Sequence, residues 1–425
     1  MIDFTEVLIL NDPSPRLHMA LRDKRPQMRI FLWGNDGGDL SFYHTLANHG
    51  VKIMAHSSLH DEVENKTTLK VTPFRDVDVK GDASISRKTS VIREQSGPIL
   101  FCPLNDTHSM MFAPVAKHLP GAKFMLPFIK QDENAVSMLQ SLGIEPIICE
   151  PKQIKEIRPS VIIFGNDWND AMREVCWRAA KLRIPTACIQ EGCLDFDTRP
   201  RMGYSDFPMI QGPIMPMFLS RPAYLATGNS RFDSISRRPL PAKPRVMINC
   251  NFTYGIHEEE RERWVRVVVE SCMKWGLDYF ISQHPRDKGR FPDYNVRPSH
   301  AGVVHDHLTD ATILVTRFST LIYEAMIMGR RVVYFNPFGE KMRLFNEDRT
   351  GGLLKAMGHD DLPKAMERAA TTMDAEEQMR FDQFVALHCG AADGCAATRV
   401  AGALQWLARC ANPMPRRGFL SYLGI

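Results

Sequence analysis

The chain has 425 residues, of which 44% are hydrophobic and 24% are charged, and this composition excludes a disordered or fibrous protein. The 53 basic and 49 acidic residues leave a net charge of +4. That charge is too small to indicate a nucleic-acid partner, because such a partner is usually met by a concentrated basic face. At about 150 residues per domain, the length predicts two or three domains.

The cysteines and the apolar runs bear on the compartment. The ten cysteines include no C-x-x-C pair, so neither a zinc site nor a disulfide framework is expected, and free thiols are typical of a reduced compartment. The first residues lack the basic start and long apolar core of a signal peptide. No run approaches the roughly 18 apolar residues of a membrane-spanning helix. We therefore expect a cytoplasmic protein, for which any membrane association would be peripheral, at the inner face.

Residues 1–97 are expected to form an N-terminal α/β extension. GNDGGD at 34–39 lacks the G-x-G-x-x-G spacing, so a tight turn is expected there rather than a nucleotide site. Residues 60–96 show no strong helical pattern and read as an irregular connection or a small β element. The other expected elements are a strand at 28–34, a helix near 39–49 and a strand at 51–57.

From residue 98 onward, short apolar strands alternate with amphipathic helices, as in a doubly wound parallel sheet. Recurrent Pro and Gly between 192 and 244 indicate a long loop and a linker. We therefore expect a Rossmann-like domain over 98–225 and a linker over 226–243. The expected elements are strands at 98–104, 122–128, 146–149, 161–165 and 186–190, and helices at 108–118, 134–142 and 169–182.

A second series of the same kind occupies residues 244–425 and predicts a second Rossmann-like domain with a helical tail. The fold class is therefore α/β, with two Rossmann-like domains facing a cleft and the N-terminal extension added to them. The expected elements are strands at 245–252, 278–285, 301–304, 311–318 and 330–337, helices at 257–275 and 319–329, and a helical tail over 361–412.

The segment ATILVTRFSTLIYEAMIMGRRVVYFNP carries the most informative pattern. Ser319 and Thr320 stand where a strand ends and a helix begins, so they either cap that helix or, with its free N–H groups, hold a phosphate. Glu324 follows Thr320 by about one helical turn and faces the same way. A carboxylate there is well placed to accept hydrogen bonds from a ribose diol. Gly329 is expected to end the helix. The alternative is a capped helix with an incidental glutamate.

This segment resembles the nucleotide-binding segment of GT-B glycosyltransferases, and of related bacterial surface-carbohydrate and CDP-glycerol glycerophosphotransferase-like proteins. Further matches follow the expected order across roughly residues 98–350. YLATGNSRFDSI (224–235) resembles a T-G-N-P-R-F-D segment where such proteins cross between domains, with Ser230 in place of the proline. RVMINCNF (245–252) resembles the first strand of their C-terminal domain, and ISQHPRD (281–287) resembles their strand-end H-P element.

The resemblance implies the donor-binding residues. Ser319 and Thr320 would meet the donor phosphates, and Glu324 would bind the ribose. His284 matches a histidine that contacts nucleotide phosphate in bacterial sialyltransferase-like enzymes. A histidine before proline at a strand end can also be only a turn residue.

The candidates for a catalytic base lie in the N-terminal half. TACIQEG (186–192) matches a place that reads Q-H-G in glycerophosphotransferase-like relatives and resembles an acidic pair before glycine in sialyltransferases. Glu191 is therefore the first candidate for the base that deprotonates an acceptor hydroxyl, although the departure from histidine leaves the acceptor class open. Asp106 or His108, in PLNDTHSMMFAP (103–114), is the second candidate.

For other polar residues in these loops, a structural role is the alternative to a functional one. Thr107 or Asp106 could simply cap the helix that follows. In GNDWND (165–170), Asn166 and Asp167 could line the same cleft, or Asn169 could cap a helix.

No metal site is expected. HDH (305–307) looks like a ligand trio, but adjacent residues cannot easily direct both imidazoles to one ion. The basic residues in PMPRRGF (413–419) could touch anionic lipid, and a solvated tail is the alternative.

We therefore expect a glycosyltransferase that moves a sugar, or a polyol phosphate, from a nucleotide-activated donor to a hydroxyl of a surface polysaccharide or another glycan, including a lipid-linked one. The transfer is expected to be inverting and metal-independent, with no cofactor besides the donor. One alternative is a nucleotide-sugar 2-epimerase. Another is a non-catalytic member of a polysaccharide assembly complex. Neither the oligomeric state nor the identity of the donor sugar follows from the sequence.

Overall fold

The computed structural model describes residues 4–10, 21, 25, 27–33, 41–74, 97–127, 133–192, 202–219, 224–253, 255–300 and 302–409. Contacts divide these residues into two compact units. The larger unit contains the described residues up to Ser234 and those from Ala386 onward, and the smaller unit runs from Ile235 to Val385. GNDGGD (34–39) and PMPRRGF (413–419) lie outside the described residues.

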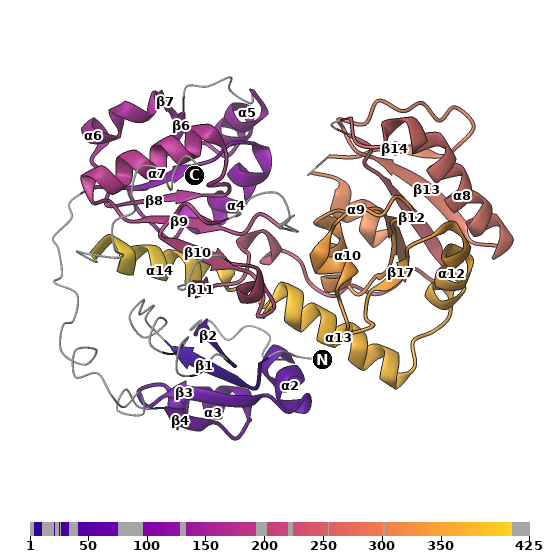
Figure 1. The fold of residues 1–425 in the computed structure, drawn as a ribbon, viewed down its shortest axis with the longest axis horizontal. Coiled ribbons are helices and arrows are strands. Elements are labelled where there is room, and N and C mark those ends of the chain that lie inside the picture. The colour runs from indigo at the N-terminus through magenta and orange to yellow at the C-terminus, as the bar shows by residue number, and fades with distance from the viewer. Residues whose placement is uncertain are drawn as a thin grey trace. The chain divides into compact units, whose positions relative to one another are not determined.

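The described part of the larger unit contains a sheet of eleven parallel strands, in the order β4-β3-β1-β2-β11-β10-β9-β8-β5-β6-β7 (Figure 1). Its central strands are buried along their whole length, because helices cover the faces of a parallel sheet and continuous apolar runs satisfy both faces. The strands are β1 (Glu6–Leu10), β2 (Met28–Leu32), β3 (Lys52–His56), β4 (Thr72–Phe74), β5 (Ile99–Cys102), β6 (Lys123–Pro127), β7 (Ile147–Cys149), β8 (Val161–Phe164), β9 (Thr186–Ile189), β10 (Phe207–Ile210) and β11 (Leu225–Ala226).

Some helices of the larger unit begin at a short polar side chain that caps them. Asn169, for example, accepts a hydrogen bond from the Ala171 backbone at the start of α7. The core of the unit combines apolar residues of α4, the central strands and α14. The helices are α2 (Ser41–Asn48), α3 (His60–Thr67), α4 (Asp106–Ala116), α5 (Glu133–Ser141), α6 (Ile154–Ile157), α7 (Asp170–Leu182) and α14 (Ala396–Arg409), with short 3₁₀ turns η2 (Pro151–Gln153), η3 (Met215–Phe218) and η4 (Ser230–Phe232).

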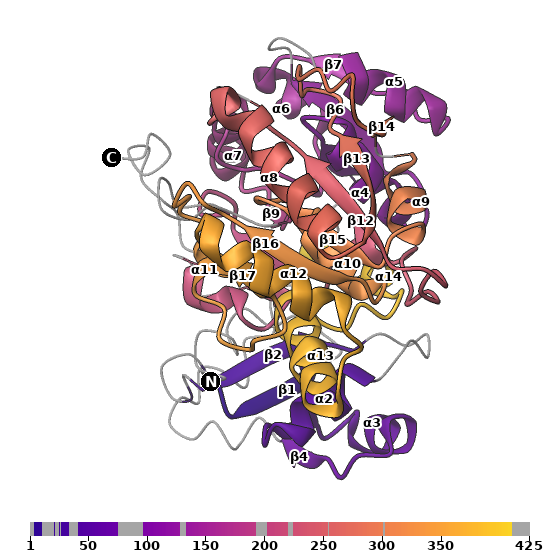
Figure 2. The same ribbon diagram turned by 90° about the vertical axis from the view of Figure 1, so that its right-hand side faces the viewer.

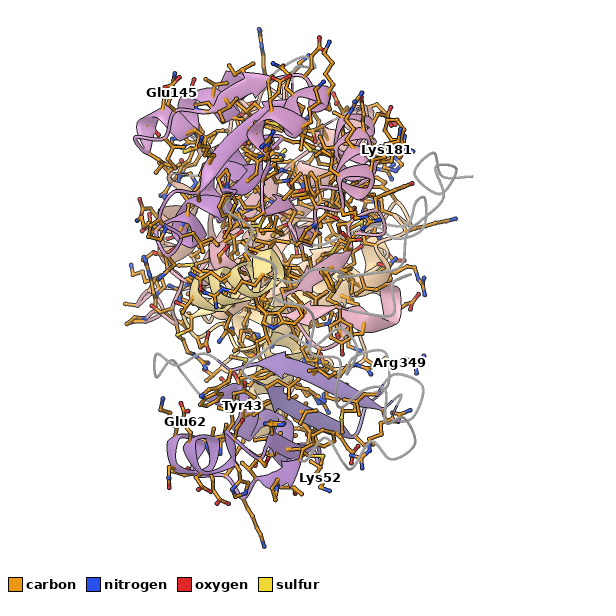
Figure 3. The ribbon with its side chains drawn as sticks, turned by 90° about the vertical axis from the view of Figure 1, so that its left-hand side faces the viewer. Tyr43, Lys52, Glu62, Glu145, Lys181 and Arg349 are labelled. Atoms are coloured by element: carbon orange, nitrogen blue, oxygen red, sulfur yellow. The ribbon has the colours of Figure 1, made fainter. Side chains whose placement is uncertain are left out.

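The contacts divide the chain at points other than those expected from the sequence. Strands β1–β4 join the main sheet through β2, where Phe31 pairs with Ala226 of β11. At the other end of the chain, α14 packs into the core of the larger unit. Tyr43 of α2 is buried, and the charge of Arg399 of α14 is near enough to act on its hydroxyl (Tyr43 is labelled in Figure 3). Burial raises the pKa of the Tyr43 hydroxyl well above its ordinary value.

Two expectations for local structure in the larger unit are wrong. The stretch from 192 to 244, expected to be a loop and linker, contributes β10 and β11 to the middle of the sheet. These strands are short and interrupted by turns rich in Pro and Gly, so their pattern resembles that of a loop. Residues 60–96, expected to lack a strong helix, contain α3. Only Val63 and Thr67 of α3 are buried, so its periodic signal is weak.

The smaller unit holds a parallel sheet with six described strands, in the order β14-β13-β12-β15-β16-β17. This is the 3-2-1-4-5-6 order of a Rossmann-like sheet. Helices α8 and α12 cover one face (Figure 2), and their apolar residues form a core with β12, β13, β15 and β16. The strands are β12 (Arg245–Cys250), β13 (Asp278–Gln283), β14 (Val296–Pro298), β15 (Ile313–Thr316), β16 (Arg331–Phe335) and β17 (Leu354–Ala356).

The helices of the smaller unit agree broadly with expectation. Gly329 follows α10 at φ +83°, as expected of a glycine that ends a helix. The strand expected at 301–304 is wrong: the third strand is β14, and Val304 begins α9 instead. The helices are α8 (Arg261–Lys274), α9 (Val304–Thr309), α10 (Leu321–Ile327), α11 (Arg343–Asn346), α12 (Leu362–Ala370) and α13 (Ala375–Cys389, which continues into the larger unit), with 3₁₀ turns η5 (Glu258–Glu260) and η6 (His359–Asp361).

Two observations concern the whole described chain. None of its helices, over the residues given above, is long and apolar enough to cross a membrane. The eight cysteines within those residues are buried free thiols.

The attachment of α14 gives a first prediction. The Asp233 carboxylate accepts hydrogen bonds from the Ala396 and Ala397 backbone N–H groups at 2.9 and 2.6 Å, at the start of α14. Replacing Asp233 by Ala leaves both donors unsatisfied, so we expect a loss of about 1–2 kcal/mol in unfolding free energy by urea denaturation. The exposed Asp293→Ala, as control, should change it by less than about 0.5 kcal/mol. Equal stabilities of the two variants would contradict the capping role.

Candidate functional site

In the larger unit, the loops that follow β5, β8 and β9 meet at the carboxyl edge of the sheet. β8 lies between the other two strands. A side chain from the loop after β5 must therefore cross the end of β8 to reach the loop after β9. The sequence order of the strands reverses between β5 and β8, and ligands of open α/β sheets bind outside the carboxyl ends at such a reversal.

His108 is held at this edge in a defined tautomer. Asn105 caps α4 by accepting the His108 backbone N–H at 2.8 Å, so the helix begins one residue earlier than a cap at Asp106 would allow. The His108 side chain is fully buried. The Leu104 backbone N–H donates to His108 Nδ1 at 3.1 Å. Because a backbone N–H only donates, Nδ1 carries no proton and the ring hydrogen is on Nε2.

Gly165, directly after β8, has no side chain and so leaves room for the imidazole of His108. A Cβ on Gly165 would stand 2.6–2.9 Å from three atoms of the His108 ring, much closer than van der Waals contact. The residue that follows β8 must therefore lack a side chain for His108 to occupy this position.

The imidazole reaches Glu191, directly after β9. His108 Nε2 lies 3.2 Å from Glu191 Oε2, and 29% of the Glu191 side chain is exposed. Burial opposes ionisation, but the neighbouring His108, the Arg231 guanidinium and the Asn105 amide hold the pKa of Glu191 below its ordinary value. The site therefore presents an ionised, oriented and partly accessible carboxylate.

Buried amides fix the backbone around Glu191. Gln190 is fully buried, and its side chain accepts the Gln211 backbone N–H at 3.0 Å and donates to the Gly192 carbonyl at 2.8 Å. Asn229 donates its side-chain N–H to the Gln190 carbonyl at 2.9 Å. Asn229 belongs to the TGN segment, so this segment supports the loop that carries the candidate base.

The other polar candidates of this edge have structural partners. The Asp106 carboxylate accepts the backbone N–H of Thr107 at 2.9 Å, and among the described residues no hydrogen bond or ion pair joins it to the His108–Glu191 pair. Asn166 accepts the backbone N–H groups of Trp168 and Asn169, which closes a turn.

Asp167 also has a structural position. It is fully buried, and its Oδ2 accepts hydrogen bonds from the Tyr204 backbone and from the backbone and hydroxyl of Ser205. Asp167 thus anchors the segment that leads into β10.

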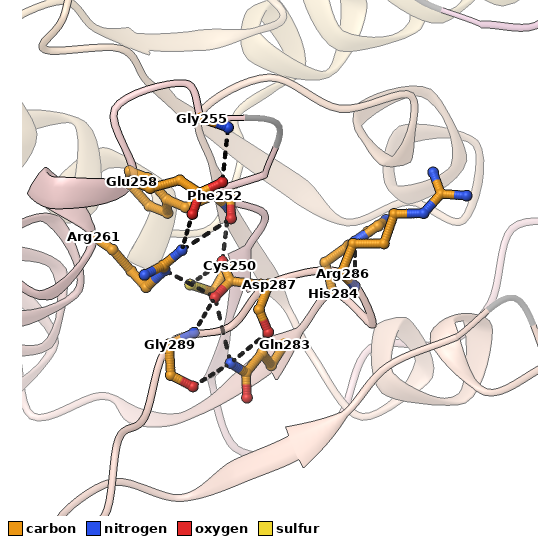
Figure 4. A network of polar contacts seen from close by, with 10 residues as sticks. All are labelled: Cys250, Phe252, Gly255, Glu258, Arg261, Gln283, His284, Arg286, Asp287 and Gly289. Atoms are coloured by element: carbon orange, nitrogen blue, oxygen red, sulfur yellow. Dashed lines mark hydrogen bonds and ion pairs between the residues drawn. The ribbon is translucent and has the colours of Figure 1, made fainter.

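In the smaller unit, a network of hydrogen bonds and ion pairs fixes the loop after β13 (Figure 4). The buried Asp287 carboxylate accepts the Phe252 and Gly289 backbone N–H groups at 2.7 and 2.8 Å, and pairs with Arg261 Nε at 2.8 Å. His284 lies in the same loop but outside these contacts. Its Nδ1 accepts the Arg286 backbone N–H at 3.2 Å, which leaves the ring hydrogen on Nε2.

The loop after β15 carries the other predicted donor residues. Asn251, which follows β12, donates its side-chain N–H to the Phe318 carbonyl at 2.5 Å and so ties the two strand ends together. The Ser319 hydroxyl accepts the Leu321 backbone N–H at 3.1 Å, at the beginning of α10. Ser319 and Thr320 are half-buried. β12 separates β13 from β15, so His284 and these two hydroxyls lie at ends of strands that share one neighbour.

Glu324 is covered by a histidine. His305 Nε2 lies 2.6 Å from Glu324 Oε2. No part of the Glu324 side chain is exposed, whereas 29% of the His305 side chain is. The sequence led us to expect a direct contact between the Glu324 carboxylate and a ribose hydroxyl. In this conformation His305 covers the carboxylate, so a ribose hydroxyl cannot reach it directly.

The two histidines of HDH have different partners. His307 Nδ1 lies 3.0 Å from the Ser282 hydroxyl, whereas His305 faces Glu324. Burial lowers the pKa of His307. Across the described stretches of the chain, no group of three or more His, Cys, Asp or Glu residues is placed to hold a metal ion.

No protein-family model matches the sequence, and no curated protein does. Solved structures do match. The structure of a putative UDP-N-acetylglucosamine 2-epimerase from Listeria monocytogenes has a TM-score of 0.54 at 13% identity over 72% of this chain and 95% of its own. The UDP-GlcNAc 2-epimerase from Neisseria meningitidis bound to UDP-GlcNAc has a TM-score of 0.54 at 12% identity, over 72% and 99%. A spinosyn rhamnosyltransferase complexed with thymidine diphosphate has a TM-score of 0.50 at 11% identity, over 71% and 98%.

The chain has a GT-B-like fold. Its two parallel sheets with Rossmann-like strand order match these two-domain neighbours, and the fold expected from the sequence is confirmed. Identities this low show the fold alone.

Sequence reasoning missed three features of the candidate site. Gly165 gave no signal beyond its position after a strand. Asn105 stands in a polar run of the sequence, and its capping role depends on where α4 begins. His305 was considered only as a metal ligand, because its spacing to Glu324 in the sequence does not reveal that the two side chains meet.

The close approach at Gly165 gives a second prediction. A methyl group in Gly165→Ala would collide with the buried His108 ring, so we expect a loss of about 1–3 kcal/mol in unfolding free energy. Gly402→Ala is the matched control, because Gly402 is exposed on α14 and has no atom within 4 Å of an added Cβ. That control should be neutral or stabilise by up to about 1 kcal/mol. A Gly165→Ala protein as stable as wild type would contradict the described path of the imidazole.

Proposed function

We propose that this protein is a nucleotide-sugar-dependent glycosyltransferase with Glu191 as its general base. The observation that carries the proposal is the Glu191 carboxylate at the carboxyl edge of the larger sheet, kept ionised by its neighbours and partly exposed. A base must be deprotonated, oriented and accessible, and Glu191 meets all three requirements.

In this mechanism an acceptor hydroxyl of a glycan, or of a lipid-linked glycan, gives its proton to Glu191 as its oxygen attacks the anomeric carbon of the donor. The bond between that carbon and the nucleotide phosphate breaks, and the electron pair leaves with the phosphate. A single displacement of this kind inverts the anomeric centre. His108 acts through Glu191, because its Nε2 lies 3.2 Å from the carboxylate and its Nδ1 is occupied.

The donor nucleotide would bind at the carboxyl edge of the smaller unit. His284 Nε2 and the half-buried Ser319 and Thr320 would meet the negative charge that develops on the departing phosphate, without a metal ion. Glu324 belongs to the ribose side of the same site. The neighbour structures with UDP-GlcNAc and thymidine diphosphate support a nucleotide at this fold.

A nucleotide-sugar 2-epimerase is the second candidate. The two epimerase structures described above align with this chain over 95% and 99% of their own lengths, at TM-scores of 0.54. An epimerase would use Glu191 to move a proton on the donor sugar and would need no acceptor.

The role of Glu191 gives a third prediction. Glu191→Gln should lower the turnover number by about 100-fold or more, since a positioned base contributes roughly that factor, while calorimetric nucleotide affinity stays unchanged. The exposed Glu145→Gln (Glu145 is labelled in Figure 3) is the matched control and should keep full turnover. Because the pKa of Glu191 is lowered, wild-type activity should persist as pH falls to the ordinary glutamate value of 4.5 and decline only below it. Unchanged turnover in Glu191→Gln would exclude it as the base.

Incubation with donor alone separates the two activities. With UDP-GlcNAc and no acceptor, we expect NMR spectra to show a donor whose C2 configuration is unchanged. Accumulation of the 2-epimer, abolished in Glu191→Gln, would establish the epimerase instead.

A further inference from the structure

Glu324 and His305 form a closely coupled pair on neighbouring helices of the smaller unit. His305 lies in the first turn of α9, and Glu324 lies in the first turn of α10. The 2.6 Å distance between Nε2 and Oε2 places the ring hydrogen of Nε2 on the line to the carboxylate. The Thr309 hydroxyl donates to the His305 carbonyl at 2.8 Å and steadies the helix that carries the ring.

The two members of the pair differ in accessibility. Every residue of α10 is buried, and the Glu324 side chain has no exposed surface. The His305 side chain is 29% exposed. A ligand that approaches this pair therefore meets the imidazole before the carboxylate.

The second ring nitrogen of His305 is chemically suited to a hydroxyl. With the Nε2 hydrogen directed at Glu324, the neutral ring has a lone pair on Nδ1, which accepts a hydrogen bond. Within the described part of the chain, no hydrogen bond engages Nδ1. The buried carboxylate increases the electron density of the imidazole and makes Nδ1 a better acceptor.

We infer that His305 is the residue that contacts the ribose of the bound nucleotide, and that Glu324 acts through it as a positioning residue. The inference rests on the proposed nucleotide site and deepens it. It changes the assignment expected from the sequence, because the carboxylate orients the imidazole and the imidazole accepts the ribose hydroxyl. The hydroxyl in question is the 2′-hydroxyl, so the same arrangement makes the site selective for ribonucleotides over 2′-deoxyribonucleotides.

The test compares three variants. His305→Gln keeps an N–H near the Nε2 position for Glu324 but removes Nδ1. Glu324→Gln removes the charge that orients the ring. Asp306→Asn, at an exposed neighbouring position on α9, is the matched control. Thermal unfolding without nucleotide reports whether each variant folds, and if Glu324→Gln does not fold, His305→Gln and the control are sufficient.

The probes are UDP, CDP, GDP and ADP, first in a thermal-shift screen of the wild-type protein, because a ligand of the native state raises its unfolding temperature. Calorimetry then compares the nucleotide of largest shift with its 2′-deoxy counterpart. We expect wild type and Asp306→Asn to prefer the ribonucleotide. In His305→Gln the affinity for the ribonucleotide should fall by about tenfold, the factor lost with one good hydrogen bond, while the deoxyribonucleotide binds as before. Glu324→Gln should show a smaller loss in the same direction.

Other outcomes overturn the inference. If His305→Gln binds the ribonucleotide as tightly as wild type, or more tightly, while Glu324→Gln loses affinity, the carboxylate contacts the ribose once the imidazole moves. If both variants bind like wild type, the pair has no part in ribose binding, although the proposed function stands. If wild type binds none of the four ribonucleotides, the inference falls, and binding of thymidine diphosphate by the same protein then decides whether the proposed nucleotide site falls with it.

Discussion

Parallel pairing of strands is the constraint on which both candidate sites depend. In a parallel sheet all carboxyl ends lie along one edge, so loops far apart in the sequence are brought together there. In the larger unit this edge joins the loops after β5, β8 and β9, and in the smaller unit those after β12, β13 and β15. The polar residues at these strand ends therefore meet without any local relation between them.

Buried carboxylates hold the loops at these edges in place. Asp167 anchors the segment that leads into β10, and Asp287 anchors the loop after β13. Each accepts hydrogen bonds from two backbone N–H groups, and a charge that is removed from water requires such partners. Glu191 and His284 lie in the loops at the same sheet edges, and their side chains are partly exposed to solvent. Rigid loops of this kind preorganise a site before a ligand arrives.

Much of the candidate site could be predicted from single positions, and the rest could not. Glu191 and His108 were both candidates because each follows a predicted strand, and the structure brings them together. Asp106, two residues from His108, was an equal candidate and lies outside the pair, since its carboxylate accepts the next backbone N–H. The sequence could not separate these residues, because the direction of a side chain in the first turn of a helix depends on which residue caps it. Here that residue is Asn105.

The sequence by itself determined the alternation of strands and helices, the α/β class and the polar character of the strand ends, because these follow from periodicity and from local capping. Only the tertiary structure decided that β1–β4 extend the main sheet, that α14 belongs to the larger unit, and that Glu324 lies beneath His305. The physical reason is that the backbone hydrogen bonds between strands do not depend on which side chains the strands carry. The order of strands, and with it every contact between distant loops, is settled by the packing of the whole chain.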